Sequence, residues 1–242
     1  MALHGCFQPP ESSPIPSKTM NDIEIINFAT TPSLVSRYMR ELRDINIQND
    51  PMRFRTNLQR IGEIMAYEIS KRLNYTQDKV QTPLGYAMCH EITDKIVLAT
   101  ILRAGIPFHE GFLKFFDNAE NAFVSAYRRY KEKGDQFDVL VEYMATPRID
   151  GKTVILIDPM LATGSSMELG YRALLKKGTP ARLHIASVIA SRQAMEYLCD
   201  VLPSGITTIW TASIDPEINS HSYIVPGLGD AGDLAYGVKD DE

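Results

Sequence analysis

The stretch Thr153-Val-Ile-Leu-Ile-Asp-Pro-Met-Leu-Ala-Thr-Gly-Ser-Ser166 runs from a strand-like segment through a turn into a helix-like one. Residues 153–157 are apolar or β-branched without a break, which predicts a strand buried on both faces. Asp158 stands where this strand ends, and 162–166 then gathers small and hydroxyl side chains ahead of the helix-like segment 167–177. Small side chains let a phosphate reach backbone N–H groups, and a helix N-terminus adds about half a positive charge. An acid that can hold ribose hydroxyls, followed by a phosphate cradle, predicts a ribose 5-phosphate site. An ordinary strand–turn–helix junction capped by hydroxyls is the alternative.

Strand-like and helix-like segments alternate along most of the chain. We expect strands at 95–102, 122–130, 137–146, 153–157, 183–190 and 207–214, and helices at 32–44, from 51 onward, 107–116, 167–177 and 192–201. This alternation predicts an α/β fold with a mostly parallel sheet flanked by helices on both faces. Ligands of such sheets bind at the carboxyl ends of the strands, and Arg103, Asp158 and Asp215 each follow an apolar strand-like run.

Composition narrows the class of protein. The 242 residues suit one α/β domain or two small ones, and a hydrophobic content of 44% is enough for a full core. The formal net charge of −5, with acids and bases interspersed, argues against nucleic acid as a partner. Cys6, Cys89 and Cys199 are widely spaced and odd in number, so reduced thiols are expected. No apolar run reaches the roughly 18 residues of a membrane span, and we expect a cytoplasmic protein without a membrane partner.

Residues 1–19 differ in composition from the rest of the chain. The segment 8–17 is rich in proline and serine and lacks the basic and apolar blocks of a signal peptide. We expect 1–19 to be a disordered arm or a vector-derived remnant, with Met20 as a candidate start, and the sequence leaves both origins open. Residues 20–242 are expected to form a single domain.

The segment 158–166 resembles the phosphoribosyl diphosphate signature of the type I phosphoribosyltransferases. Its Asp-Pro-Met-Leu-Ala-Thr-Gly is similar to the uracil phosphoribosyltransferase branch, because purine relatives place further acids where this chain has Pro159 and Ala162. Ser165 departs from the branch, which usually has a second glycine there, and a serine costs little if the backbone keeps a negative φ. The resemblance implies a type I phosphoribosyltransferase-like domain with a small hood or arm region.

Ile101-Leu-Arg-Ala-Gly105 ends the strand expected at 95–102 with a cation and two small residues. Taken alone, Arg103 is better explained as a solvated loop arginine than as a diphosphate ligand. The segment is similar to the first pyrophosphate-binding loop of the uracil family, which favours the diphosphate role.

Tyr127-Arg128-Arg129-Tyr130 closes the next expected strand. The resemblance implies that Arg128 contacts phosphate, while Arg129 and Tyr130 depart from the usual pattern of the family. The charged segment 131–136 fits a plain hairpin tip, and in the family the corresponding region is a mobile flap that excludes water.

Tyr223-Ile-Val-Pro-Gly-Leu-Gly-Asp-Ala-Gly-Asp233 contains a formal G-x-G-x-x-G pattern. A dinucleotide site would need an early strand–turn–helix context, with an acid about 20 residues later, and that context is missing. The segment instead resembles the uracil-binding loop of the family, and a proline–glycine surface turn is the alternative. Backbone donors and acceptors match the two carbonyls and ring N–H of uracil. The resemblance places uracil against the backbone of Ile224, Gly229 and Ala231, with Asp230 facing the phosphoribosyl diphosphate and its metal.

The resemblance covers about residues 32–237 and implies transfer of ribose 5-phosphate from phosphoribosyl diphosphate to N1 of uracil, giving uridine monophosphate (UMP) and diphosphate. It implies catalytic roles for Asp158 and Arg103, with Mg²⁺ carried by the diphosphate rather than by a protein metal site. The implied phosphoribosyl diphosphate contacts are Arg103, Arg128, Asp158, Pro159, Met160, Leu161, Ala162, Thr163, Gly164, Ser165, Ser166 and Asp230. Members of the family commonly form homo-dimers or homo-tetramers and some respond to guanosine triphosphate (GTP), and the residues here leave both properties open.

Two other functions stay open. The same fold could serve a non-catalytic regulator that binds phosphoribosyl diphosphate, although such proteins usually need a basic surface and the net charge is −5. An enzyme acting on another base is the other alternative, and the loop 223–233 argues for uracil. Ser165 and Ser166 lack a G-x-S-x-G elbow and no G-K-[ST] follows a glycine loop, so a hydrolase and a P-loop ATPase are not expected.

Overall fold

The structure is a computed structural model that describes residues 23–130 and 137–239, with side chains described outside 126–142. The expectations for residues 1–19, for Met20 as a start and for the flap 131–136 therefore lie outside the described residues.

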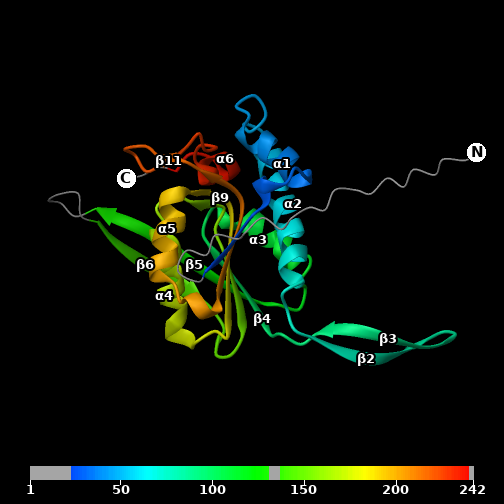
Figure 1. The fold of residues 1–242 in the computed structure, drawn as a ribbon. Helices are drawn as coiled ribbons and strands as arrows, with labels where there is room; N and C mark the ends of the chain where they lie inside the picture. Colours follow the sequence, from blue (N-terminus) through cyan, green and yellow to red (C-terminus); the bar gives the residue numbers. More distant parts are fainter. Residues whose placement is uncertain (1–22, 131–136, 240–242) are drawn as a thin grey trace, which may run out of the picture.

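A central sheet forms the middle layer of the described fold (Figure 1). Its eight described strands follow the order β1-β10-β9-β7-β4-β5-β6, with the short β8 beside β9. Their bounds are β1 Glu24–Asn27, β4 Ile96–Ile101, β5 Glu120–Tyr130, β6 Phe137–Ala145, β7 Thr153–Ile157, β8 Met160–Leu161, β9 Arg182–Ser191 and β10 Thr207–Asp215. Neighbouring strands pair in parallel except β5 and β6, which are antiparallel. The mostly parallel sheet that the alternation predicts is confirmed.

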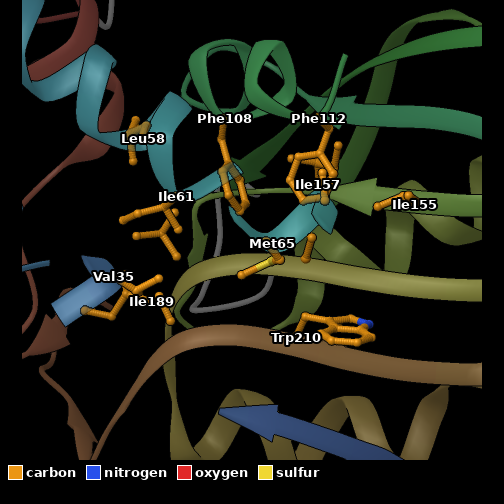
Figure 2. Close-up of a cluster of buried hydrophobic side chains, with 14 of the residues drawn as sticks. Val35, Leu58, Ile61, Met65, Phe108, Phe112, Ile155, Ile157, Ile189 and Trp210 are labelled. Atoms are coloured by element: carbon orange, nitrogen blue, oxygen red, sulfur yellow. The ribbon is translucent and has the colours of Figure 1, made fainter. Parts of the chain in front are cut away.

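Helices cover both faces of this sheet (Figure 1). On one face lie α1 (Leu34–Arg43), α2 (Pro51–Ser70) and α3 (Gly105–Leu113), and on the other lie α4 (Ser165–Leu174) and α5 (Arg192–Val201). Because successive strand side chains point to opposite faces, Ile155 and Ile157 of β7 join the first hydrophobic cluster, whereas Val154 and Leu156 join the second. The first cluster packs side chains of α2 and α3 over those of β7, β9 and β10 (Figure 2).

Short-range signals in the sequence set where the helices begin. Pro51 occupies the first turn of α2, and the Asp50 side chain accepts hydrogen bonds from the N–H groups of Met52 and Arg53. Ser191 caps α5 by accepting from the Ala194 N–H at 2.9 Å. Helix α4 begins at Ser165, two residues earlier than expected, and its end continues as a 3-10 turn, Leu175–Lys177.

Some elements carry no clear periodic signal in the sequence. The hairpin of β2 (Tyr75–Thr82) and β3 (Gly85–Ile92) projects from the body (Figure 1), and most of its residues are exposed on both faces. This hairpin fits the arm region that the resemblance implies. Further short elements are β11 (Glu217–Ile218), β12 (Ile224–Val225), α6 (Ala231–Tyr236) and the 3-10 turns Phe28–Thr30 and Ser204–Ile206.

The parallel arrangement brings the carboxyl ends of β4, β7 and β10 to one edge of the sheet. Arg103, Asp158 and Asp215 stand at these ends, as the sequence predicts. The thiols of Cys89, which is exposed, and Cys199, which is buried, are both free, and Cys6 lies outside the described residues. In the described part of the chain, no helix combines the length and the apolar character needed to cross a membrane.

Candidate active site

The loop after β7 is shaped by close packing against α5. Gly164 has a φ of +81°, and a Cβ there would lie 3.0 Å from the Tyr197 ring and 3.1 Å from the Leu198 side chain. Both the backbone conformation and the contact with α5 therefore favour glycine. On the other side of the loop, the Ser191 hydroxyl donates to the Ala162 carbonyl at 2.5 Å. Segment 158–166, called the phosphate loop below after the role that the sequence predicts, is thus fixed at two points.

The phosphate loop opens onto a small pocket at the start of α4. The pocket measures about 60 Å³ and is lined by Asp158, Met160, Leu161, Ala162, Thr163, Gly164, Ser166 and Met167. Ser165 is the first residue of α4, and Ser222 alone among the described non-glycine residues has a positive φ. The backbone at Ser165 therefore has a negative φ, so a serine costs little at this position.

Asp158 stands at the end of β7 with its side chain part-buried. Its Oδ1 accepts a hydrogen bond from the Met160 N–H at 3.3 Å. Burial raises the pKa of Asp158 to about 7, and the Met160 bond opposes this shift only partly. A carboxylate that lacks solvation gains from hydroxyl donors, so the position suits the two hydroxyls of a ribose.

Pro159 and Leu161 are expected to contact phosphoribosyl diphosphate, and each also makes a contact that holds the loop in the fold. The Pro159 carbonyl accepts hydrogen bonds from the N–H groups of Val188 and Ile189 in β9, at 3.1 and 2.9 Å. Leu161 is 1% exposed and packs in the second hydrophobic cluster. These residues shape the loop through packing and strand pairing.

Arg103 joins the end of β4 to the last helix of the chain. It follows a cis peptide bond with Leu102, and its Nη2 lies 3.2 Å from Asp233 Oδ1 in α6. The Arg103 side chain remains 42% exposed, so it stays available to an anion from solvent. Gly105 is required at the start of α3, because a Cβ there would lie 2.2 Å from the Thr100 hydroxyl.

Segment 223–233, called the uracil loop below after the role that the resemblance implies, is irregular apart from β12 and the start of α6. It contains a cis Val225–Pro226 bond and two left-handed glycines, Gly227 with φ +63° and Gly229 with φ +88°. Asp230 is exposed, and its Oδ1 caps α6 by accepting from the Asp233 N–H at 3.0 Å.

The three segments meet at one place, although they are far apart in sequence. Arg103 contacts Asp233, and the Ala231 N–H points at the Met160 sulfur at 3.4 Å. Segments 101–105, 158–166 and 223–233 therefore lie together, as the sequence interpretation requires. The Arg128 side chain lies outside the described residues, although its backbone belongs to β5.

Two residues that contact the uracil loop were not predicted to do so. Arg43, at the end of α1, and Asp215, at the end of β10, hydrogen bond to Gly227. The sequence places Asp215 after an apolar strand-like run, at the edge where ligands bind, but does not indicate its contact with Gly227. Nothing near Arg43 in the sequence indicates its contact.

Segment 158–166 follows the central strand β7, and Arg103 follows the neighbouring strand β4, at the carboxyl edge of a mostly parallel sheet. This is the arrangement that the resemblance to the type I phosphoribosyltransferases implies. A sequence model described as uracil phosphoribosyltransferase matches residues 29–238. The chain therefore belongs to the uracil phosphoribosyltransferase family.

Individual relatives agree with this assignment. The chain is 60% identical to a uracil phosphoribosyltransferase of Porphyromonas gingivalis over 217 residues, covering 90% of this chain and all of the relative. It is 44% identical to one of Methanothermobacter thermautotrophicus, covering 79% and 87% of the two chains. Among solved structures, the AQ2163 protein of Aquifex aeolicus is similar with a TM-score of 0.76 and 28% identity, covering 88% of this chain and 98% of that one.

Proposed function

We propose that the three converging loops transfer ribose 5-phosphate from phosphoribosyl diphosphate to N1 of uracil, releasing UMP and diphosphate. The transferase activity follows from family membership. Two contacts support these loops as the site of the reaction. Arg103 binds Asp233, and the Ala231 N–H points at Met160, so the uracil loop lies against both Arg103 and the phosphate loop.

The phosphate loop binds the ribose 5-phosphate half of the donor. Asp158 accepts hydrogen bonds from the ribose hydroxyls, and the amides of 162–166 bind the 5-phosphate at the start of α4. Bound hydroxyls favour the ionised form of Asp158, which offsets the burial that raises its pKa. A negative charge beneath the ribose then stabilises positive charge at C1 as the bond to diphosphate loosens.

Arg103 binds the departing diphosphate. Its pair with Asp233 is exposed and therefore weak, so a diphosphate carrying several negative charges can replace that carboxylate as its partner. Arg128 is proposed as a second phosphate contact. No protein nucleophile is required, because the reaction depends on orientation and electrostatics.

Uracil is read by the backbone of Ile224, Gly229 and Ala231. Uracil offers two carbonyls and a ring N–H, and a rigid backbone can pair with all of them. Gly229 has open space on its Cα, where a Cβ would meet nothing closer than 3.6 Å, so its left-handed φ rather than crowding favours glycine.

Magnesium fits this site as an ion that arrives with the diphosphate. Within the described residues, no group of three or more His, Cys, Asp or Glu side chains is arranged to hold a metal. Mg²⁺ commonly uses one or two carboxylates together with substrate phosphates, and the exposed Asp230 is the residue that would face it. Bound there, the ion would neutralise charge on the leaving diphosphate.

Release of diphosphate, measured with uracil and with or without Mg²⁺, tests the proposal. Uracil-dependent release that needs Mg²⁺ is expected, and comparison of uracil, hypoxanthine and orotate as acceptors tests the base. Folded protein that releases no diphosphate with uracil would contradict the proposal and favour the non-catalytic regulator. A gel-shift titration at physiological salt would then test that alternative. A cytoplasmic location, homo-dimer or homo-tetramer assembly and a GTP effector stay predictions.

A further inference from the structure

Asp215 stands at the same sheet edge as Asp158 but is bound by an arginine. Arg43 Nη1 lies 2.7 Å from Asp215 Oδ2, and Arg43 Nη2 lies 2.6 Å from Oδ1. The Asp215 side chain is 5% exposed. Burial alone would raise the pKa of Asp215, but the bonds from Arg43 and from the Gly227 N–H outweigh it and hold the pKa below its ordinary value. The Asp215 carboxylate is therefore ionised at neutral pH.

This pair holds Gly227 of the uracil loop by both of its backbone polar groups. The Gly227 N–H donates to Asp215 Oδ2 at 2.9 Å, and Arg43 Nη1 donates to the Gly227 carbonyl at 2.9 Å. The loop doubles back tightly here, since a Cβ on Gly227 would lie 2.0 Å from the Ile224 carbonyl oxygen. Fixing Gly227 therefore fixes Ile224 as well.

The chain after α1 holds the next residue of the loop. Gln48 Nε2 donates to the Leu228 carbonyl at 3.2 Å and to the Leu42 carbonyl at 2.8 Å. Ser213 in β10 accepts from Arg43 Nη2 at 2.9 Å, which orients the guanidinium. The uracil loop is thus tied to the N-terminal part of the fold as well as to β10 and β11, which precede it in the chain.

The arrangement is better suited to fixing geometry than to stabilising the fold. In a buried ion pair the cost of desolvation largely offsets the attraction, so net stabilisation is small. A two-pronged guanidinium–carboxylate contact, by contrast, fixes distance and orientation together. A base read by backbone groups depends on that placement.

We propose that Arg43 and Asp215 are positioning residues for uracil, which clamp Gly227 and thereby set the Ile224 backbone against the base. The inference rests on the proposed function, because it takes 223–233 as the uracil-binding loop. Neither residue touches the reacting atoms, so each acts on the reaction through Gly227.

Steady-state kinetics of Asp215→Asn and Arg43→Lys, with each substrate varied in turn, test this role. Each substitution should raise the KM for uracil by about tenfold or more, because small displacements of binding groups are costly, and leave the KM for phosphoribosyl diphosphate within about twofold. Arg53→Lys is the matched control: the Arg53 side chain is 48% exposed and pairs with Glu41, and its substitution should leave both constants unchanged. Equal rises in both KM values would overturn the proposal.

A double variant separates positioning from stability. Arg43→Met with Asp215→Leu removes both charges without leaving one buried and unpaired. It should melt at a higher temperature than Asp215→Asn while keeping the raised KM for uracil. A double variant with the wild-type KM for uracil would show that the pair is only structural. Failure of the proposed function is distinguishable, because wild-type protein would then release no diphosphate with uracil.

Discussion

The phosphate loop and the uracil loop are both proposed to present backbone groups to a ligand, but they are held in different ways. The phosphate loop connects the buried five-residue strand β7 to the ten-residue helix α4, and its anchor Ser191 belongs to the next strand along the chain. The uracil loop has only a two-residue strand and a six-residue helix of its own. Its carbonyl partner Arg43 lies 184 residues from Gly227.

The two loops differ in how far their shape is set by elements next to them in the sequence. A strand–turn–helix unit sets the path of its own loop, because both flanking elements are anchored in the core. An irregular loop has no such support and takes its shape from side chains elsewhere in the fold. The two halves of this site should therefore respond to different substitutions.

The largest effect is expected from Gly227→Ala. The left-handed φ of +63° and a Cβ 2.0 Å from the Ile224 carbonyl require the loop to move. We expect kcat/KM for uracil to fall by about 100-fold or more, since backbone strain and a displaced binding group both contribute. Steady-state assays with uracil varied will measure it.

Gly164→Ala is the matched substitution in the phosphate loop. Its φ is also left-handed, but the atoms that a Cβ would crowd most closely are side chains of α5, which can shift. The substitution should reduce kcat/KM for phosphoribosyl diphosphate more than it reduces kcat/KM for uracil. The opposite pattern would break the comparison between the loops.

The next largest effect is expected on kcat, from a substitution at Asp158. Asp158→Asn should lower kcat by at least about tenfold, because a neutral amide no longer stabilises positive charge at C1. The melting temperature should not fall, because the buried position favours an uncharged side chain, and unchanged turnover would remove Asp158 from its assigned role. Single-turnover measurements separate this effect from product release.

A smaller effect is expected from Ser191→Ala. Loss of its bond to the Ala162 carbonyl should cost about 1 kcal/mol, or about fivefold in the KM for phosphoribosyl diphosphate. The KM for uracil should stay unchanged. Because Ser191 also caps α5, a lower melting temperature is expected as well. An increase confined to uracil would contradict the separate support of the two loops.

The pH dependence of stability should differ in sign between the two strand-end acids, Asp158 and Asp215. The folded-state pKa of Asp158 is about 7, above the ordinary 3.8, so the folded protein keeps a proton that the unfolded chain loses. The stability advantage of Asp158→Asn over wild type should therefore grow from about pH 4 to pH 7 and then level off.

Asp215 should behave in the opposite way, because its pKa is lowered in the folded protein. The stability that ionised Asp215 contributes is fully present above its ordinary pKa of 3.8. This stability is lost as the pH falls through the lower pKa of Asp215 in the folded protein. The deficit of Asp215→Asn should accordingly shrink in acid. Thermal melts of both variants between about pH 3 and pH 8 will compare the two trends. The same trend for both acids would contradict the assigned environments.

Much of the fold could be predicted from the residues. The strand 153–157 and the helix 192–201 have the predicted bounds, since continuous burial and helical spacing leave clear patterns. The hairpin at 75–92 was not predicted as strands, because its exposed residues follow neither period. Strand β1 was missed for a similar reason, since it has only four residues.

The phosphate loop and the glycines of the uracil loop follow from the sequence, because short stretches of backbone chemistry can be recognised without knowing their neighbours. The meeting of Arg103 with Asp233, and the clamp of Arg43 and Asp215 on Gly227, depend on the tertiary structure. Parallel strands bring distant carboxyl ends to one edge, and helices packed on that sheet place α1 beside the last loop. Such contacts arise only when the chain is folded, so no local pattern of residues encodes them.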